Sequence, residues 1–195
     1  MLQSCLLKLA AAVSASVIAC AAQADSLLTA EIQHRLEAMG SLNADFSQIR
    51  KFDGQSMTLR SSGTISVERK KSVVWTQLKP FRQVITFHND RTTLRMEDEP
   101  EQVLGDGNST VFKSFSDVIR KIIEGDFASL EDNFQVSSEG SLGKGWSITL
   151  TPKTGLFVKA LKTIYIRGKK TVDSVEIIEA NADMTRIDFV NVRAN

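Results

Sequence analysis

Residues 42–48 read Leu-Asn-Ala-Asp-Phe-Ser-Gln, and every second side chain in the first six positions is apolar. In an extended strand, Leu42, Ala44 and Phe46 would therefore share one face, and the polar residues between them would share the other. Asp53-Gly54 follows a few residues later and favours a tight hairpin turn. This stretch predicts an antiparallel β-sheet with one buried face.

The alternation continues toward the C-terminus in short runs separated by turn residues. Its apolar positions are Met57, Leu59, Ile65 and Val67, then Val73 and Trp75, Ile85 and Phe87, Leu94 and Met96, Phe134 and Val136, and Trp146, Ile148 and Leu150. Three further runs cover residues 161–166, 172–178 and 185–192. About ten strands with short connections favour an antiparallel sheet that is closed or half-closed into a barrel. Gly63 lies inside one run, where we expect a bend or a close approach of another backbone.

Two segments have helical rather than alternating periodicity. The first begins after Ser26 and ends at Gly40, and the second ends at Gly125. Their apolar stripes are Leu28, Ile32, Leu36 and Met39 in the first, and Phe112, Phe115, Val118, Ile119 and Ile122 in the second. A single apolar stripe means that each helix lies against an apolar surface. Two interpretations remain open: the helices plug a fully packed barrel, or sheet and helices enclose a lipid-sized cavity.

The N-terminal segment predicts export from the cytoplasm. Lys8 is the only charged residue before Asp25, residues 9–22 are apolar or small, and Ala22-Gln23-Ala24 has the small-x-small pattern of a signal-peptidase site. We therefore expect residues 1–24 to be a signal peptide, and residues 25–195 to form one domain that begins at Asp25. An alternative is that Val17-Ile18-Ala19-Cys20 acts as a lipobox, so that a lipid-modified Cys20 anchors the protein to a membrane.

Composition excludes several classes of protein. Cys5 and Cys20 are the only cysteines, so a mature chain starting at Asp25 has no disulfide and no thiolate nucleophile. The whole chain has 24 Lys and Arg residues against 23 Asp and Glu residues. Losing Lys8 with the signal peptide leaves no net charge, and therefore no basic surplus for binding nucleic acid.

Catalytic motifs are absent from the sequence. The only histidines are His34, on the polar side of the first predicted helix, and His88, near a predicted turn. Neither position suits a Ser-His-Asp triad, and there is no HExxH or CxxC pattern for zinc. Gly143-Lys144-Gly145 suits a hairpin turn rather than a phosphate loop. We expect a protein that is not an enzyme and that uses no cofactor or metal, although paired carboxylates and a lipid-ester hydrolase with an unidentified serine remain alternatives.

The order of several motifs resembles the LolA family of outer-membrane lipoprotein carriers. Residues 42–48 match the family's x-x-a-x-F-x-Q strand, and Trp75 follows Arg69 at the family's spacing of six. Residues 145–153 resemble its L-x-P-K strand end, and residues 187–191 resemble its closing hairpin. The sequence departs from the pattern at three points, namely Lys70 for a usual proline, Val73 for a common aromatic residue and Asp90-Arg91 for Asp-Gly. These departures indicate a divergent branch of the family.

The resemblance implies a half-open antiparallel barrel with a helical lid over an apolar cavity. It implies a monomeric periplasmic carrier that takes acylated lipoproteins from an inner-membrane ABC exporter to an outer-membrane receptor. Arg69 would hold the lid closed through hydrogen bonds to backbone carbonyls, unless it is a solvated arginine at a strand end. The residues expected to line the cavity are Phe46, Val73, Trp75, Ile85, Phe87, Phe112 and Phe115. A lipid-anchored receptor, or a carrier of another lipid-like ligand, remains the alternative function.

Overall fold

A computed structural model describes residues 26–97, 99–104, 110–153 and 155–194. Within these ranges the side chains of residues 110–113 and 115 are not described. The expected signal peptide, residues 1–24, and the alternative lipidation site at Cys20 therefore lie outside the described residues. The same holds for the side chains of Phe112 and Phe115.

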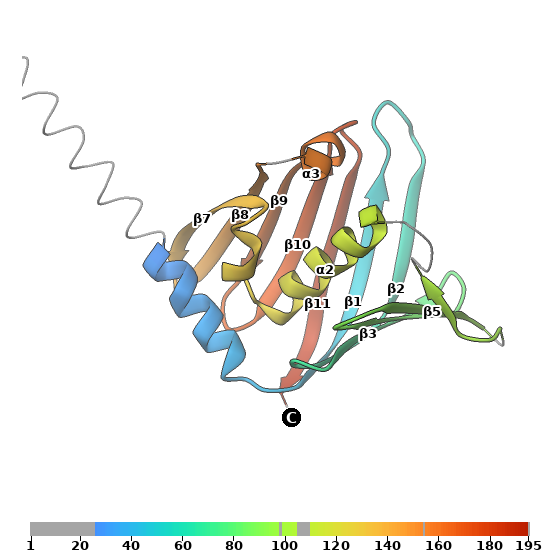
Figure 1. Ribbon diagram of the computed structural model, residues 1–195, viewed down its shortest axis with the longest axis horizontal. Helices are drawn as coiled ribbons and strands as arrows, with labels where there is room; N and C mark the ends of the chain where they lie inside the picture. The colour runs from blue at the N-terminus through green and yellow to red at the C-terminus, as the bar shows by residue number, and fades with distance from the viewer. Residues whose placement is uncertain (1–25, 98, 105–109, 154, 195) are drawn as a thin grey trace, which may run out of the picture.

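Eleven antiparallel strands form one curved sheet in the described residues (Figure 1). They are β1 (Leu42–Lys51), β2 (Thr58–Glu68), β3 (Ser72–Lys79), β4 (Gln83–His88), β5 (Thr92–Met96), β6 (Gln102–Leu104), β7 (Phe134–Ser141), β8 (Gly145–Pro152), β9 (Leu161–Gly168), β10 (Val172–Glu179) and β11 (Met184–Ala194). Their order across the sheet is β6-β5-β4-β3-β2-β1-β11-β10-β9-β8-β7, so β6 and β7 are edges and the sheet stays open. The predicted mainly-β, half-open antiparallel architecture is confirmed.

Helices occupy the concave side of this sheet. The first helix (residues 26–37) lies near β7 and β8, and α2 (Thr110–Glu124) runs in front of β10, β11 and β1 (Figure 1). Both follow the predicted stripes, because Ile32 and Leu36 of the first helix and Val118 and Ile122 of α2 are buried. A short 3-10 turn, η1 (Ala128–Leu130), and a short helix, α3 (Gly155–Ala160), complete the described helices.

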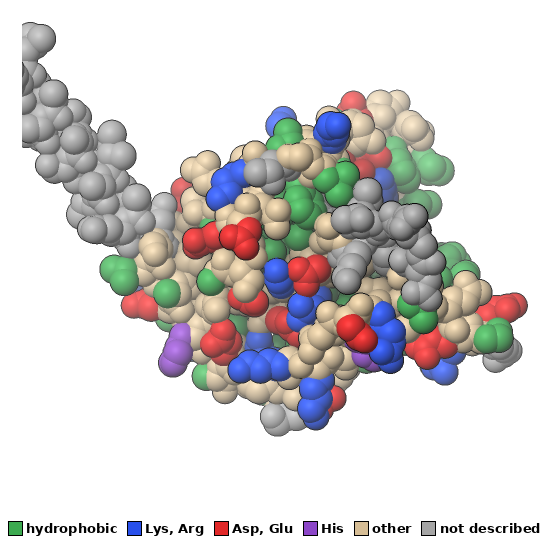
Figure 2. Space-filling model, viewed as in Figure 1, with side chains coloured by type: hydrophobic (Ala, Val, Ile, Leu, Met, Phe, Trp, Pro, Cys, Tyr) green, Lys and Arg blue, Asp and Glu red, His purple; other side chains and the backbone are tan. Residues whose placement is uncertain are grey.

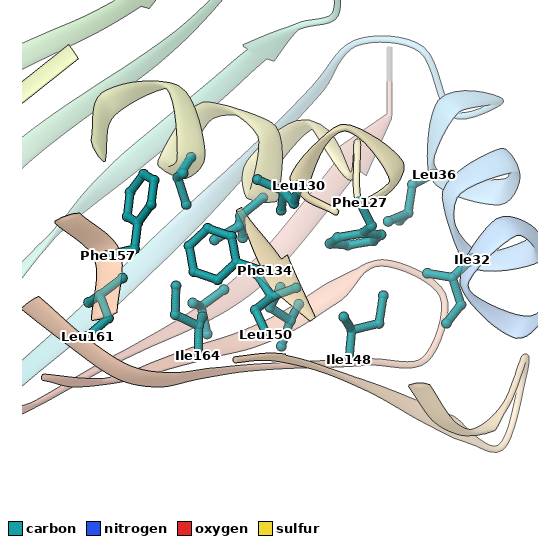
Figure 3. Close-up of a cluster of buried hydrophobic side chains, with 14 of the residues drawn as sticks. Ile32, Leu36, Phe127, Leu130, Phe134, Ile148, Leu150, Phe157, Leu161 and Ile164 are labelled. Atoms are coloured by element: carbon teal, nitrogen blue, oxygen red, sulfur yellow. The ribbon is translucent and has the colours of Figure 1, made fainter. Parts of the chain in front are cut away.

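The core has two parts, and they belong to different halves of the sheet. The larger cluster fills the β7–β10 half with side chains from the first helix, α2, η1 and α3 (Figure 3). Within it, the rings of Phe134 and Phe157 have centroids 5.1 Å apart. The smaller cluster lies on β1–β4 and consists of Ala44, Phe46, Ile65, Val67, Val73, Trp75 and Phe87. Helices therefore pack against the β7–β10 half of the sheet, whereas the smaller cluster on β1–β4 consists of side chains from the strands themselves.

Gly63 is where two backbones come close, as predicted. A Cβ atom at this position would lie 1.9 Å from the carbonyl oxygen of Thr76 on β3. The β2–β3 register also shifts between Ser62 and Gly63. Glycine is required there because any larger residue would push the two strands apart.

Candidate ligand cavity and its latch

A cavity of about 530 Å³ lies between α2 and the concave face of the sheet. It is lined by Gln48, Arg50, Trp75, Gln77, Gln83, Ile85, Phe87, Ile119, Ile122, Ile123, Ala160, Leu161, Val175, Ile177, Glu179, Thr185, Ile187 and Phe189. Ligand sites in proteins commonly measure on the order of 300–1,000 Å³ and are mostly apolar. Figure 2 shows hydrophobic side chains at the surface below α3 and beside the start of α2. The size and lining suit an apolar ligand.

Trp75 lies at the centre of the aromatic wall. Its ring is 4.0 Å from that of Phe46, measured between centroids, and 6.4 Å from that of Phe189 in an edge-to-face arrangement. Phe46 and Phe189 come from β1 and β11, which are paired at this level, although the two residues are far apart in sequence. Such packing holds the indole rigidly while one side of it remains available to the cavity.

The structure places the expected cavity residues in two positions. Trp75, Ile85 and Phe87 line the cavity. Phe46 and Val73 are buried in the smaller cluster beside it and are not among its lining residues. Phe112 and Phe115 lie on α2, but their side chains are outside the described part of the structure.

Several lining residues were missed by sequence reasoning. Ile187 and Phe189 of β11, and Val175 and Ile177 of β10, alternate as inward positions should, and this alternation could have identified them. These residues face the same cavity as Trp75 because β11 pairs with β1. A single sequence does not reveal that pairing. The polar lining residues were missed for a different reason, because inward positions of a sheet are expected to be apolar.

Arg69 follows the last residue of β2 and connects the ends of two helices. Its Nε atom donates to the carbonyl oxygen of Gly40, 2.8 Å away, just beyond the first helix. Its second donor, NH1, bonds to the carbonyl oxygen of Glu124, the last residue of α2. Carbonyls at helix C-termini have no partner within the helix and carry partial negative charge, so a guanidinium stabilises both ends together.

The surroundings of Arg69 are partly desolvated. Burial lowers the pKa of Arg69, while the carboxylates of Glu124 and Glu37 oppose that change. Burial also raises the pKa of Glu124, although Arg120 and Arg69 act in the opposite direction. Arg120 donates to Glu124 at 2.7 Å and to Asp117 at 2.8 Å, so α2 carries its own charge network beside the Arg69 contact.

Arg69 and the main cavity have neighbouring residues in common. Arg69 lines a small void of about 30 Å³ together with Ile122 and Ile123 of α2, and both isoleucines also line the main cavity. Gly125 ends α2 with a positive φ of 75°, and a Cβ atom there would meet the Leu36 side chain at 2.7 Å. A movement of α2 would therefore change the cavity lining and the Arg69 contacts together.

The described residues offer few features of other functional classes. They contain no group of three or more His, Cys, Asp or Glu side chains placed to hold a metal ion. No helix in the described part of the chain combines the length and apolar character needed to cross a bilayer. His34 is exposed on the first helix, and His88 is half-buried at the end of β4.

The fold defines a class of protein with an open antiparallel sheet and an apolar cavity beneath a helix. Comparison of the sequence identifies the family within that class. The chain matches the model of the family described as outer membrane lipoprotein carrier protein LolA over residues 37–195, and it belongs to this family. It is a distant member, and the family's description names a carrier rather than a catalyst.

Individual relatives are consistent with that distance. An outer-membrane lipoprotein carrier protein of Methylococcus capsulatus is 27% identical over 175 residues, covering 89% of this chain and 80% of that protein. One from Pseudomonas fluorescens is 23% identical and covers 89% and 82% of the two chains. Among solved structures, a LolA superfamily protein of Nitrosomonas europaea has 8% identity and a TM-score of 0.47, covering 86% of this chain and 94% of that one.

Proposed function

We propose that this protein is a periplasmic carrier that shields the acyl chains of lipoproteins in the cavity beneath α2. The observation that carries the proposal is the cavity itself, whose wall of Trp75, Ile85, Phe87 and Phe189 is apolar. An acyl chain gains about 0.8 kcal/mol for each buried methylene group. An exposed lipoprotein therefore cannot cross the aqueous periplasm, and a carrier must cover its chains.

The route follows from the family and from the N-terminal segment. Residues 1–24 direct export, and the domain of residues 25–195 then works as a monomer between the two membranes. It takes acylated cargo from an inner-membrane ABC exporter and passes it to an outer-membrane lipoprotein receptor. The Ala22-Gln23-Ala24 pattern and the family's description as a carrier support this route.

Arg69 serves as the latch of the empty state in this proposal. Its hydrogen bonds to Gly40 and Glu124 hold the ends of the first helix and α2 against the end of β2. Because opening breaks these bonds, closure competes with cargo and lowers the apparent affinity by the fraction of closed molecules. A carrier needs this property, since it must release cargo to its receptor.

Tryptophan fluorescence tests whether the cavity takes acyl chains. Trp146 lies in the packed larger cluster and donates to the carbonyl oxygen of Lys169 at 3.1 Å, so it provides an internal control. In Trp146→Phe, where Trp75 is the reporter, a palmitoylated peptide should change the emission. In Trp75→Phe, where Trp146 is the reporter, emission should stay constant.

The affinities of peptides with shorter acyl chains make this test more specific. Replacing the palmitoyl chain by myristoyl and then lauroyl should weaken binding roughly tenfold for each two methylenes removed. Unchanged emission of Trp75 at saturating peptide, or an equal response to the unacylated peptide, would contradict the proposal.

A lipid-anchored receptor on the same fold is the second candidate, and the Val17-Ile18-Ala19-Cys20 sequence favours it. The two candidates differ in the mature N-terminus. The mass of the protein recovered from its native host decides between them: a start at Asp25 supports the carrier, and an acylated Cys20 supports the receptor.

A further inference from the structure

The cavity changes character along the strand direction. At the level of Trp75, Ile85 and Phe87 its wall is apolar, but closer to the end of β1 and the start of β4 the inward positions are polar. The polar lining residues are Gln48, Arg50, Gln77, Gln83, Glu179 and Thr185. These positions continue the parity of buried apolar residues such as Phe46 and Trp75, where an ordinary sheet core would remain apolar.

Two glutamines on neighbouring strands form one side of this polar end. Gln77 and Gln83 are paired across β3 and β4, and Gln83 Nε2 donates to Gln77 Oε1 at 3.4 Å. Gln77 Nε2 in turn donates to the carbonyl oxygen of Phe81 at 3.2 Å. Because a carboxamide nitrogen carries two N–H groups, each glutamine can donate a further hydrogen bond.

Arg50 forms the other side. One guanidinium nitrogen, NH2, contacts Glu179 at 2.8 Å and Asp183 at 3.3 Å. The Nε atom of Arg50 is buried without a hydrogen-bond partner among the described residues. Arg50 lines the cavity. A buried donor without a partner is costly, so its Nε atom indicates a missing acceptor at this end.

The chemistry of this end selects the ligand group. Its side chains offer N–H and O–H donors, which call for hydrogen-bond acceptors. Glu179 and Asp183 already balance the charge of Arg50, so an anionic group gains little there. The carbonyl oxygens that join acyl chains to glycerol or to an amine are uncharged acceptors, and they lie at the head of the apolar chain. We propose that the polar end of the cavity is a subsite for the ester or amide carbonyls at the head of the bound acyl chains.

This subsite rests on the proposed function, and it orients the cargo. The side chains of Arg50 and Glu179 are 35% and 25% exposed, so the polar end of the cavity reaches solvent at these two residues. The chain tail therefore points toward Phe87, and the head emerges near Arg50. Arg50 also supports the fold, because its partner Asp183 accepts a bond from the Asp53 backbone at 3.0 Å. Variants of Gln83 therefore test the subsite better than variants of Arg50.

Two ligands that differ by one carbonyl provide the test. Monopalmitoylglycerol and the hexadecyl ether of glycerol share chain length and glycerol, but only the ester has a carbonyl acceptor. The wild-type protein should bind the ester roughly fivefold more tightly, the gain expected for one net hydrogen bond. Gln83→Met keeps the side-chain size and removes the donors, so the preference should fall below about twofold while ether affinity is retained.

Gln135→Met, an exposed change on β7, should keep the wild-type preference. Thr185→Val gives a second, nearly isosteric variant of the subsite, and it should also reduce the preference. Equal affinity of the wild type for both ligands would overturn the subsite and leave the carrier function intact. An equal loss of both ligands in Gln83→Met and Thr185→Val would overturn it as well. Failure of the wild type to bind either ligand would overturn the carrier function, and the subsite with it.

Discussion

Arg69 contacts the C-terminal ends of two helices, and the residue after it explains a departure from the family pattern. The turn after β2 places Lys70 at a positive φ of 62°, and Lys71 N donates to the Glu68 carbonyl at 3.0 Å. Proline cannot adopt a positive φ. The left-handed turn therefore requires a residue other than the family's proline, and this chain has Lys70 there. The Arg69 side chain still reaches the carbonyls of Gly40 and Glu124.

Arg69→Leu should shift the lid toward the open state. Hydrogen bonds from charged donors contribute about 1.5–3 kcal/mol each, so the loss of two should change the lid equilibrium by at least roughly tenfold. The variant should bind palmitoylated peptide at least as tightly as the wild type. Its release of peptide to an excess of serum albumin should be slower, because closure no longer helps to expel the cargo.

Arg69→Lys should have a peptide affinity and a release rate between those of the wild type and Arg69→Leu, since one ammonium group cannot reproduce two directed donors. Peptide affinity, release rate and thermal stability are measured for all three. If Arg69→Leu instead loses peptide affinity in proportion to its lost stability, Arg69 has only a structural role.

Gly63→Ala should destabilise the sheet where β2 and β3 come close. A methyl group there would meet the Thr76 carbonyl at 1.9 Å, so β2 and β3 would have to separate. Overpacking of this kind costs about 1–3 kcal/mol. Urea unfolding measures the loss, with the neighbouring Ser62→Ala as the control that should change stability less. Equal stability of Gly63→Ala and the wild type would show that the strands separate freely at this position.

Residue-level prediction succeeded where family spacing or local geometry fixed the answer. Gly63 could be predicted because a glycine inside a strand commonly marks a bend or a close approach of two backbones. For Arg69, the family resemblance implied contacts with lid carbonyls; the structure has hydrogen bonds to Gly40 and Glu124, and the latch role stays a prediction. The polar lining residues could not be predicted in the same way. Gln77 and Gln83 share the parity of Trp75 and Ile85, but inward positions of a sheet are expected to be apolar, so a glutamine there was not expected to line the cavity.

At the level of elements, α2 combines an apolar inner face with a charged outer network. Ile122 and Ile123 face the cavity, while Asp117 pairs with Arg120 at 2.8 Å and Lys121 at 2.9 Å. Burial raises the pKa of Asp117, but hydrogen bonds and charge attraction from Lys121 and Arg120 together leave it below its ordinary value. The helix therefore gains from an ionised Asp117.

This network predicts a weak acid sensitivity of the lid. A carboxylate with a lowered pKa stabilises the folded state above its ordinary pKa of 3.8, and this contribution is lost as the pH falls through the lowered value. Asp117→Asn should therefore reduce the fall in thermal stability below about pH 4. Glu124 acts in the opposite sense, because its pKa is raised and its ionisation above pH 4.5 costs stability. Identical acid limbs for Asp117→Asn and the wild type would contradict this role.

Element prediction depended on length. The first helix and α2 are long enough for a stripe of period 3.6 to appear, and both were predicted. The helix α3 has six residues with only Phe157 buried, and β6 has three residues. Neither is long enough to show a period, so both were missed.

At the scale of the whole molecule, the two interpretations left open by the sequence each describe one half of the sheet. Helices fill the β7–β10 half, where Phe127, Leu130 and Phe134 are fully buried. A cavity of about 530 Å³ remains beneath α2, and its wall comes mainly from β1, β3, β4, β10 and β11. The volume of the cavity depends on how strongly the sheet curves and on how much of the concave side the helices fill. No local pattern of residues encodes either quantity.

The packed cluster and the cavity have different consequences for stability. The packed half supplies cohesion, because removing its large side chains would leave voids. The cavity adjoins that core, because Ile122, Leu161 and Val175 belong to the packed cluster and also line the cavity. Under the proposed function, the acyl chains occupy the incompletely filled part of the sheet.

Native mass spectrometry of the mature protein with a palmitoylated lipopeptide tests the central claim most directly. The control is the same peptide without its acyl chains, at the same concentration. If the cavity holds acyl chains, the spectrum should contain a one-to-one complex with the acylated peptide and none with its unacylated form. Equal complexes with both peptides, or no complex with either, would contradict the assignment of this protein as a carrier of acyl chains.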